Sequence, residues 1–226
     1  MKLVHPLLQT VFDTERHGVL TLVSENAAFF RAFLEDLTAQ INGDPGQIVL
    51  SMRDQPIDAG KYLEILDQFV PFEINRKPLL TKILGVLEKK ALNEDFYLPT
   101  RELLAGIEKY AEDLAFSENC DIICSKVSVS SLLRAIGIEL RDDYENLAEK
   151  ILDYMELVRE YDRDKLFLTV NLRSYFSDRE TEMFAESASL HGFHLLMLEN
   201  REYPRLPNEF RVVVDKDLCE IIPFDP

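Results

Sequence analysis

The chain has 226 residues, of which 46% are hydrophobic and 29% charged, a composition typical of a folded globular protein and unlike a disordered or fibrous one. Its formal net charge of −16 argues against a membrane-surface protein and against a generally basic coat for nucleic acid. Apolar runs span only a few residues, so we expect a cytoplasmic protein with no membrane segment and with its three cysteines reduced.

Residues 1–74 have the pattern of an α/β fold. The β-branched apolar run at 19–23 predicts a buried strand, Ser24 is the expected N-cap, and a helix is expected over 27–41. The Gly-Asp-Pro-Gly sequence at 43–46 ends this helix before a strand at 47–52, and a further strand is expected within 62–66.

From Pro78 onward the apolar residues follow a helical period. They form one face of a helix, with Pro78 in its first turn. The residues of this face are Leu79, Leu80, Ile83, Leu84 and Leu87. A second helix is expected to open at Thr100, and a third to run from 127 or 128 to Ile136, where Gly137 ends it. Residues 75–139 are therefore predicted to be an all-helical insertion.

Residues 140–226 return to an α/β pattern. We expect helices over 144–161 and 177–189, buried strands over 165–170 and 193–198, and a closing hairpin within 212–222. Ser177 and Glu180 have the spacing of a capping box. Because wholly apolar strands alternate with helices, the predicted class is α/β, with a parallel or mixed sheet covered on both faces.

Motifs of nucleotide and enzyme chemistry are missing. No Gly-x4-Gly-Lys-Ser/Thr sequence exists, and the loop after the first strand reads Ser-Glu-Asn, whose charge would repel phosphate. His191 and His194 are expected at a surface turn, and Cys120 and Cys124 as small buried apolar side chains. We find no catalytic pattern and expect no enzyme.

One stretch is basic. Residues 75–110 carry seven basic and five acidic side chains, whereas each other segment is acidic. The basic candidates are Arg76, Lys77, Lys82, Lys89 and Lys90. Lys82 and Lys89 are two helical turns apart, about 10 Å, with Arg76 and Lys90 expected beside them. This spacing fits contacts with the phosphates of a DNA duplex, and the alternative is an ordinary solvated helix face.

An acidic cluster follows the basic stretch. Its members are Glu112, Asp113, Glu118 and Asp121. Carboxylates of this kind can collect hard oxygen ligands for Ca²⁺, although the spacing matches no EF-hand loop. The alternative is a solvated helix end.

Several segments resemble one known family. These are Lys-Leu-Phe-Leu-Thr-Val-Asn at 165–171, Tyr-Phe-Ser-Asp-Arg-Glu at 175–180, Leu-His-Gly-Phe-His-Leu-Leu-Met-Leu-Glu at 190–199 and Arg-Glu-Tyr at 201–203. They are similar to the C-terminal half of the small ring-forming DNA-binding adaptation protein of type II-A CRISPR systems. Residues 19–23, 129–138 and 215–222 extend the likeness over nearly the whole chain.

The resemblance implies a discontinuous α/β head, residues 1–74 and 140–226, like a nucleotide-hydrolase core without a phosphate loop, and an inserted helical leg, residues 75–139. It also implies a homotetrameric ring that holds double-stranded DNA during spacer acquisition, without catalysis or nucleotide. CRISPR integrase proteins and the effector nuclease are the implied partners, and Ca²⁺ the implied ion, with Glu118 and Asp121 as its candidates here. An acidic protein-interaction scaffold and a degenerate nucleotide-binding protein are the alternatives.

Overall fold

The computed structural model describes residues 1–118 and 120–223. The chain divides into two compact units. The α/β unit comprises Met1–Glu73 and Tyr144–Pro226, and the helical unit comprises Ile74–Asp143. The periodicity of the sequence put these divisions after residues 74 and 139.

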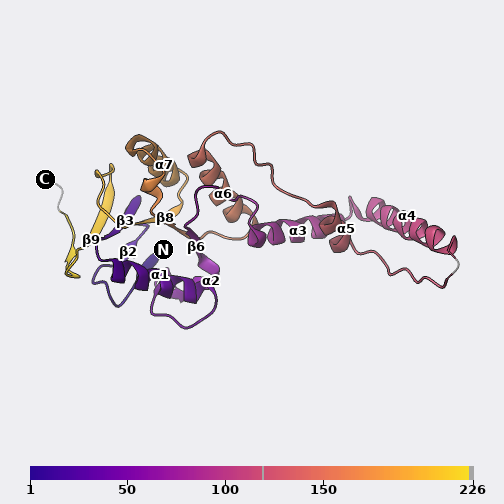
Figure 1. The fold of residues 1–226 in the computed structure, drawn as a ribbon, viewed down its shortest axis with the longest axis horizontal. Coiled ribbons are helices and arrows are strands. Elements are labelled where there is room, and N and C mark those ends of the chain that lie inside the picture. The colour runs from indigo at the N-terminus through magenta and orange to yellow at the C-terminus, as the bar shows by residue number, and fades with distance from the viewer. Residues whose placement is uncertain (119, 224–226) are drawn as a thin grey trace. The chain divides into compact units, whose positions relative to one another are not determined.

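The α/β unit is built on a six-stranded sheet with the strand order β10-β9-β3-β8-β7-β6 (Figure 1). Five strands of this sheet are parallel, and among its described strands only β10, at the edge, is antiparallel. The strands are β3 (Val19–Ser24), β6 (Leu63–Leu66), β7 (Leu166–Val170), β8 (His194–Glu199), β9 (Glu209–Val214) and β10 (Glu220–Ile221). This sheet confirms the predicted α/β class.

Helices cover both faces of this sheet. Figure 1 shows α1 (Ala27–Ile41) and the short α2 (Ala59–Tyr62) on one side, and α6 (Leu147–Tyr161) and α7 (Asp178–Leu190) on the other. A single 3-10 turn, η1 (Leu172–Ser174), follows β7. All six residues of β3 and all five of β7 are buried, as expected of central parallel strands covered on two sides.

A second, antiparallel sheet of four strands was not predicted. Its strand order is β2-β1-β4-β5, formed by β1 (Lys2–Val4), β2 (Phe12–Asp13), β4 (Val49–Met52) and β5 (Gln55–Ile57). Only β4 falls in a predicted strand. The others have two or three residues each, too few to produce a periodic pattern.

Three predicted helix boundaries were wrong, one of them the start of the helix expected over 144–161, which begins at Leu147. Ser24 is the last residue of β3, where it pairs with Val214. The N-cap of α1 is Asn26, whose side chain accepts hydrogen bonds from the backbone N–H groups of Ala28 and Phe29. The second helix of the insertion begins at Tyr97, three residues before Thr100.

The helical unit contains α3 (Lys77–Ala91), α4 (Tyr97–Phe116) and α5 (Val129–Ile136). Gly137 ends α5 with φ +72°, a left-handed conformation that glycine adopts without strain, as predicted. The two chain segments at the base of this unit are held together by Asn75. Its side chain donates to the Leu140 carbonyl at 3.0 Å and accepts from the Leu140 N–H at 2.6 Å.

Candidate nucleic-acid interface

Helix α3 carries four of the five basic candidates, and the fifth, Arg76, precedes it. The helix begins after Arg76, the N-cap residue, and has Pro78 in its first turn, where the missing N–H of proline costs no hydrogen bond. Leu79 and Ile83 are its buried residues, and α3 packs against α5. The opposite side of α3 is left to polar residues, as its amphipathic pattern requires.

Lys82 and Lys89 are exposed and, being seven residues apart, lie on one stripe along α3. Seven residues at 1.5 Å each place their Cα atoms about 10 Å apart. Lys77 is also exposed, at the start of the helix. In the described part of the chain, neither Lys77 nor Lys89 forms an ion pair with a carboxylate, so both ammonium groups are available to an external anion.

Arg76 and Lys90 do not continue this stripe. Arg76 is half-buried and lies outside the helix, with the extended backbone of an N-cap residue. Lys90 is about 100° around the helix axis from Lys89. Its ammonium lies 5.7 Å from the centre of the Phe96 ring. Lys82 and Lys89 are therefore the pair that shares one face.

Helix α4 has an apolar face that is largely exposed in the described part of the chain. All twenty of its residues are described and none is buried. Leu103 is 55% exposed, Tyr110 66% and Leu114 52%, and Leu104, Ile107 and Ala111 share their helical spacing. The i, i+3, i+4, i+7 spacing of these residues in the sequence predicts an apolar helix face. The spacing does not indicate whether that face is buried or exposed in the folded chain.

The acidic candidates Glu118 and Asp121 line one shallow hollow together with Glu112, Cys120 and Cys124. Within residues 1–118 and 120–223, no three His, Cys, Asp or Glu side chains meet in an arrangement that could hold a metal ion. The side chains described here therefore do not fit a complete calcium site, which takes six to eight oxygen ligands.

The cysteine and histidine candidates lie at the surface or at a turn. Cys120 and Cys124 are exposed free thiols, so the prediction that they are buried apolar side chains was wrong. His191 lies exposed at the end of α7, and His194 is half-buried at the start of β8 with Nδ1 2.6 Å from Thr14 Oγ1. The predicted turn between them is present at Gly192, with φ +69°.

The turn after β3 is capped by its own side chain. Only Glu25 and Asn26 connect β3 to α1. The Asn26 side chain binds the first free N–H groups of α1 at 3.0 Å each, and its amide donates to the Lys216 carbonyl at 2.9 Å. These N–H groups are the donors with which a helix N-terminus holds an anion, and here they already have an acceptor.

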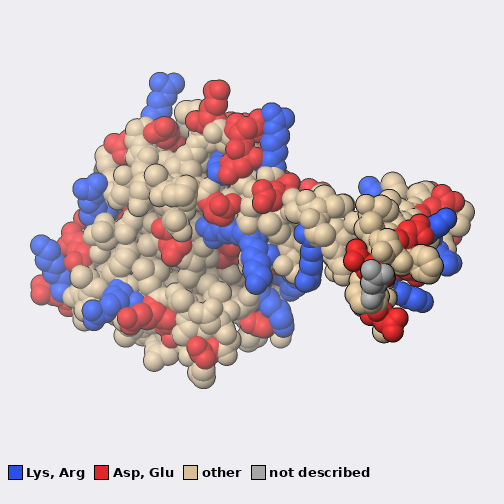
Figure 2. Space-filling view, turned by 45° about the vertical axis from the view of Figure 1, so that its right-hand side comes forward, with Lys and Arg blue, Asp and Glu red and all other residues tan. Residues whose placement is uncertain are grey.

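Acidic and basic side chains are interspersed on the face of each unit drawn in Figure 2. No helix among the described residues is both long enough and apolar enough to span a membrane.

The parallel sheet with helices on both faces, the self-capped turn after β3 and the inserted helical unit define an α/β protein of nucleotide-hydrolase-like architecture without a phosphate loop. Residues 40–218 match the family described as CRISPR-associated protein (Cas_Csn2). The chain belongs to this family, which confirms the resemblance found in the sequence and assigns the protein to CRISPR adaptation.

Proteins similar to the chain include one Csn2 relative and one solved structure. The chain is 22% identical over 218 residues to the CRISPR-associated protein Csn2 of Enterococcus faecalis, with 96% of each chain covered. The crystal structure of Stu0660 of Streptococcus thermophilus has the same fold, with a TM-score of 0.57 and 12% identity. That comparison covers 100% of this chain and 77% of the other.

Proposed function

We propose that this protein is a non-catalytic, ring-forming homotetramer that binds double-stranded DNA ends without sequence preference during spacer acquisition. In this proposal it acts in the cytoplasm, together with the CRISPR integrase proteins and the effector nuclease. The observation that carries the DNA-binding part is the exposed stripe of Lys82 and Lys89 on α3.

Phosphate contacts from lysines are independent of sequence and supply most of the affinity of non-specific DNA binding. The chain has a net charge of −16, so DNA is repelled by most of its surface and must be held where basic side chains gather. Lys77 at the start of α3 adds a third exposed ammonium to Lys82 and Lys89. A Lys-Lys spacing of about 10 Å is of the order of a few phosphates along one strand.

Self-association is supported by the uncovered apolar face of α4. A face of this kind can meet the same face of a second copy of the chain. Such a two-fold contact buries the same patch on both chains.

The test is DNA binding by the double variant Lys82→Glu with Lys89→Glu, measured over a series of salt concentrations. If two phosphate contacts are lost, the slope of log K against log salt decreases in magnitude by about 1.8 and the affinity falls at every salt concentration. The matched control is Arg179→Glu with Lys216→Glu, the same charge change at exposed positions of the α/β unit.

An equal loss in the control would mean that net charge, and not the α3 stripe, governs binding. If the unaltered protein holds no linear duplex at moderate salt, the proposal fails and the acidic scaffold is the better description. Native mass with a linear duplex and with a covalently closed circle tests the ring, because a ring loaded from an end holds only the linear form. Calcium stays a prediction, tested by repeating these measurements in calcium and in chelator.

A further inference from the structure

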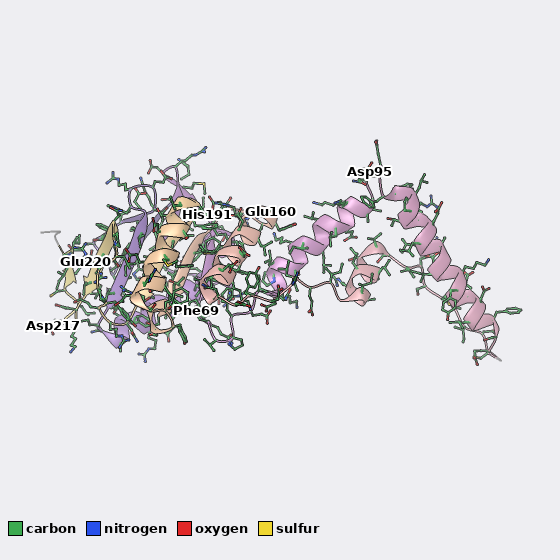
Figure 3. All side chains as sticks on the ribbon, turned by 90° about the horizontal axis from the view of Figure 1, so that it is seen from above. Phe69, Asp95, Glu160, His191, Asp217 and Glu220 are labelled. Carbon is green, nitrogen blue, oxygen red and sulfur yellow. The ribbon has the colours of Figure 1, made fainter. Side chains whose placement is uncertain are left out.

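A groove of about 490 Å³ lies between α6 and α7 on the α/β unit. Its apolar lining comes from Leu152 on α6, Met183 and Phe184 on α7, and Phe193 just before β8. Phe184 and Phe193 are buried at its base, whereas Met183 is 58% exposed at its edge. Figure 3 shows the two helices beside each other, with Glu160 labelled in the last turn of α6 and His191 at the end of α7.

One end of the groove is held in place by Arg159. Its guanidinium lies 4.5 Å from the centre of the Phe193 ring and donates to the His191 carbonyl at 2.7 Å. The same guanidinium pairs with Glu156. These contacts join α6 to the turn after α7, so the groove exists before any ligand arrives and little ordering free energy is spent on binding.

The wall formed by α6 is acidic. Glu149 and Asp153 line the groove four residues apart on one face of the helix. Unlike Glu156, neither forms an ion pair within the described residues, and both are exposed. An apolar floor beside an unneutralised acidic wall selects a ligand that is apolar on one side and cationic next to it.

We propose that this groove docks an amphipathic, basic helical segment of another protein, with its apolar residues on Leu152, Met183 and Phe193 and its Lys or Arg side chains against Glu149 and Asp153. Helices bind grooves of this kind through apolar residues at i, i+3, i+4 and i+7. The flexible, polarisable side chain of Met183 adapts to the shape of such a ligand.

The length and charge of the groove favour this occupant. The lining residues of α6 span Ala148 to Glu156, a helical length of about 12 Å, which accommodates two turns of a docked helix. A second copy of this chain, at a net charge of −16, is repelled as a whole by the acidic wall. The inference concerns the α/β unit alone and does not depend on DNA binding by α3.

The probe for the test is a synthetic, fluorescein-labelled helical peptide made of Leu and Lys, with Leu at i, i+3, i+4 and i+7. Its binding to the full chain is followed by fluorescence anisotropy. A second peptide carries Glu in place of every Lys. We expect saturable binding of the Leu/Lys peptide, and binding weaker by about tenfold or more for the Leu/Glu peptide.

Two changes on the protein probe the two halves of the groove. Glu149→Lys with Asp153→Lys reverses the charge of the acidic wall, and Met183→Ser removes the apolar edge. Each change is expected to lower the affinity of the protein for the Leu/Lys peptide by about tenfold or more. The control, Glu182→Lys with Glu186→Lys, makes the same charge change at exposed positions of α7 that do not line the groove, and is expected to leave binding within about twofold.

Each variant should unfold at the same temperature as the wild type, which shows that the substitution leaves the folded structure around the groove intact. Met183→Ala replaces Met183→Ser if the serine variant unfolds early. The proposal is overturned if no saturable binding occurs, if the control weakens binding as much as the groove variants, or if both peptides bind alike. It is also overturned if the groove variants lower the native mass of the protein, because the occupant would then be a second copy.

Discussion

Two ionisable side chains, Glu199 and Arg173, are buried at the carboxyl edge of the parallel sheet. Glu199, the last residue of β8, is completely buried, and burial raises its pKa to about 7. Its Oε1 accepts from the backbone N–H of Arg173 at 3.2 Å, and Oε2 has no hydrogen-bond partner among the described residues. Arg173 is itself buried, donates to the Pro204 carbonyl and to Asp178, and lies over the Tyr203 ring.

We expect Glu199 to make stability depend on pH. Its pKa is raised above the ordinary value of 4.5, so the native state holds the proton more tightly than the unfolded chain does. Stability is therefore lost as the pH rises from about 4.5 through 7, by up to roughly 3 kcal/mol. Glu199→Gln removes this loss, so its free energy of unfolding, relative to the wild type, should rise between pH 5 and pH 8 in urea titrations. A difference that is constant with pH would contradict the assignment.

At the residue scale, the features that could not be predicted from the sequence are those that depend on tertiary pairing. Ser24 and Asn26 are both good N-cap residues, and the choice between them is made by the sheet, because Ser24 still pairs with Val214. Cys120 and Cys124 have apolar character, but the segment that holds them packs against no core and leaves them exposed. The capping box of Ser177 and Glu180 depends only on local spacing, and it is confirmed.

At the scale of elements, α3 and α4 differ in what covers them. Helix α3 buries Leu79 and Ile83, whereas α4 buries no residue. An uncovered helix of twenty residues with a continuous apolar face is stable only with a partner or by its own helix propensity. The predicted helices of the insertion were confirmed because periodicity is a property of the segment itself, but the uncovered face became visible only with the fold.

We expect Leu103→Lys with Leu114→Lys to lower the native mass of the protein, because both side chains lie on the apolar face of α4. Helix content should stay unchanged, since neither side chain is buried. Light scattering measures the mass and circular dichroism the helix content. The control, Leu98→Lys with Ala105→Lys, adds the same charge on the opposite side of α4 and should leave the mass unaltered. An unaltered mass in both variants would mean that α4 is not the contact between copies.

At the scale of the molecule, the division into two units follows from where the apolar residues are buried. The large core cluster of the parallel sheet consists only of residues from the α/β unit, from Met1 to Leu63 and from Leu166 to Val214. The sequence predicted a parallel or mixed sheet because its strands are rich in apolar residues and alternate with helices. It did not predict the four-stranded sheet, whose short strands are specified by long-range pairing such as that of Leu3 with Leu50.

We expect the α/β unit to fold without the helical unit. Replacing residues 76–139 by a short Gly-Ser linker retains Asn75 and Leu140, whose side-chain and backbone hydrogen bonds hold the two chain segments together. Cooperative unfolding in urea should persist, because the core cluster is intact, and duplex binding should be lost with α3. Loss of cooperative unfolding would show that the helical unit contributes to the core.

The hydrogen bonds of Asn26 have a consequence for energetics. A protein that holds a nucleoside triphosphate at the first turn of its sheet can couple hydrolysis to work, and so drive its association with a ligand away from equilibrium. In this chain that turn is closed by its own amide side chain. Under the proposed non-catalytic function, whatever the protein holds is therefore gained and released by mass action, set by the concentrations of ligand, salt and competing partners.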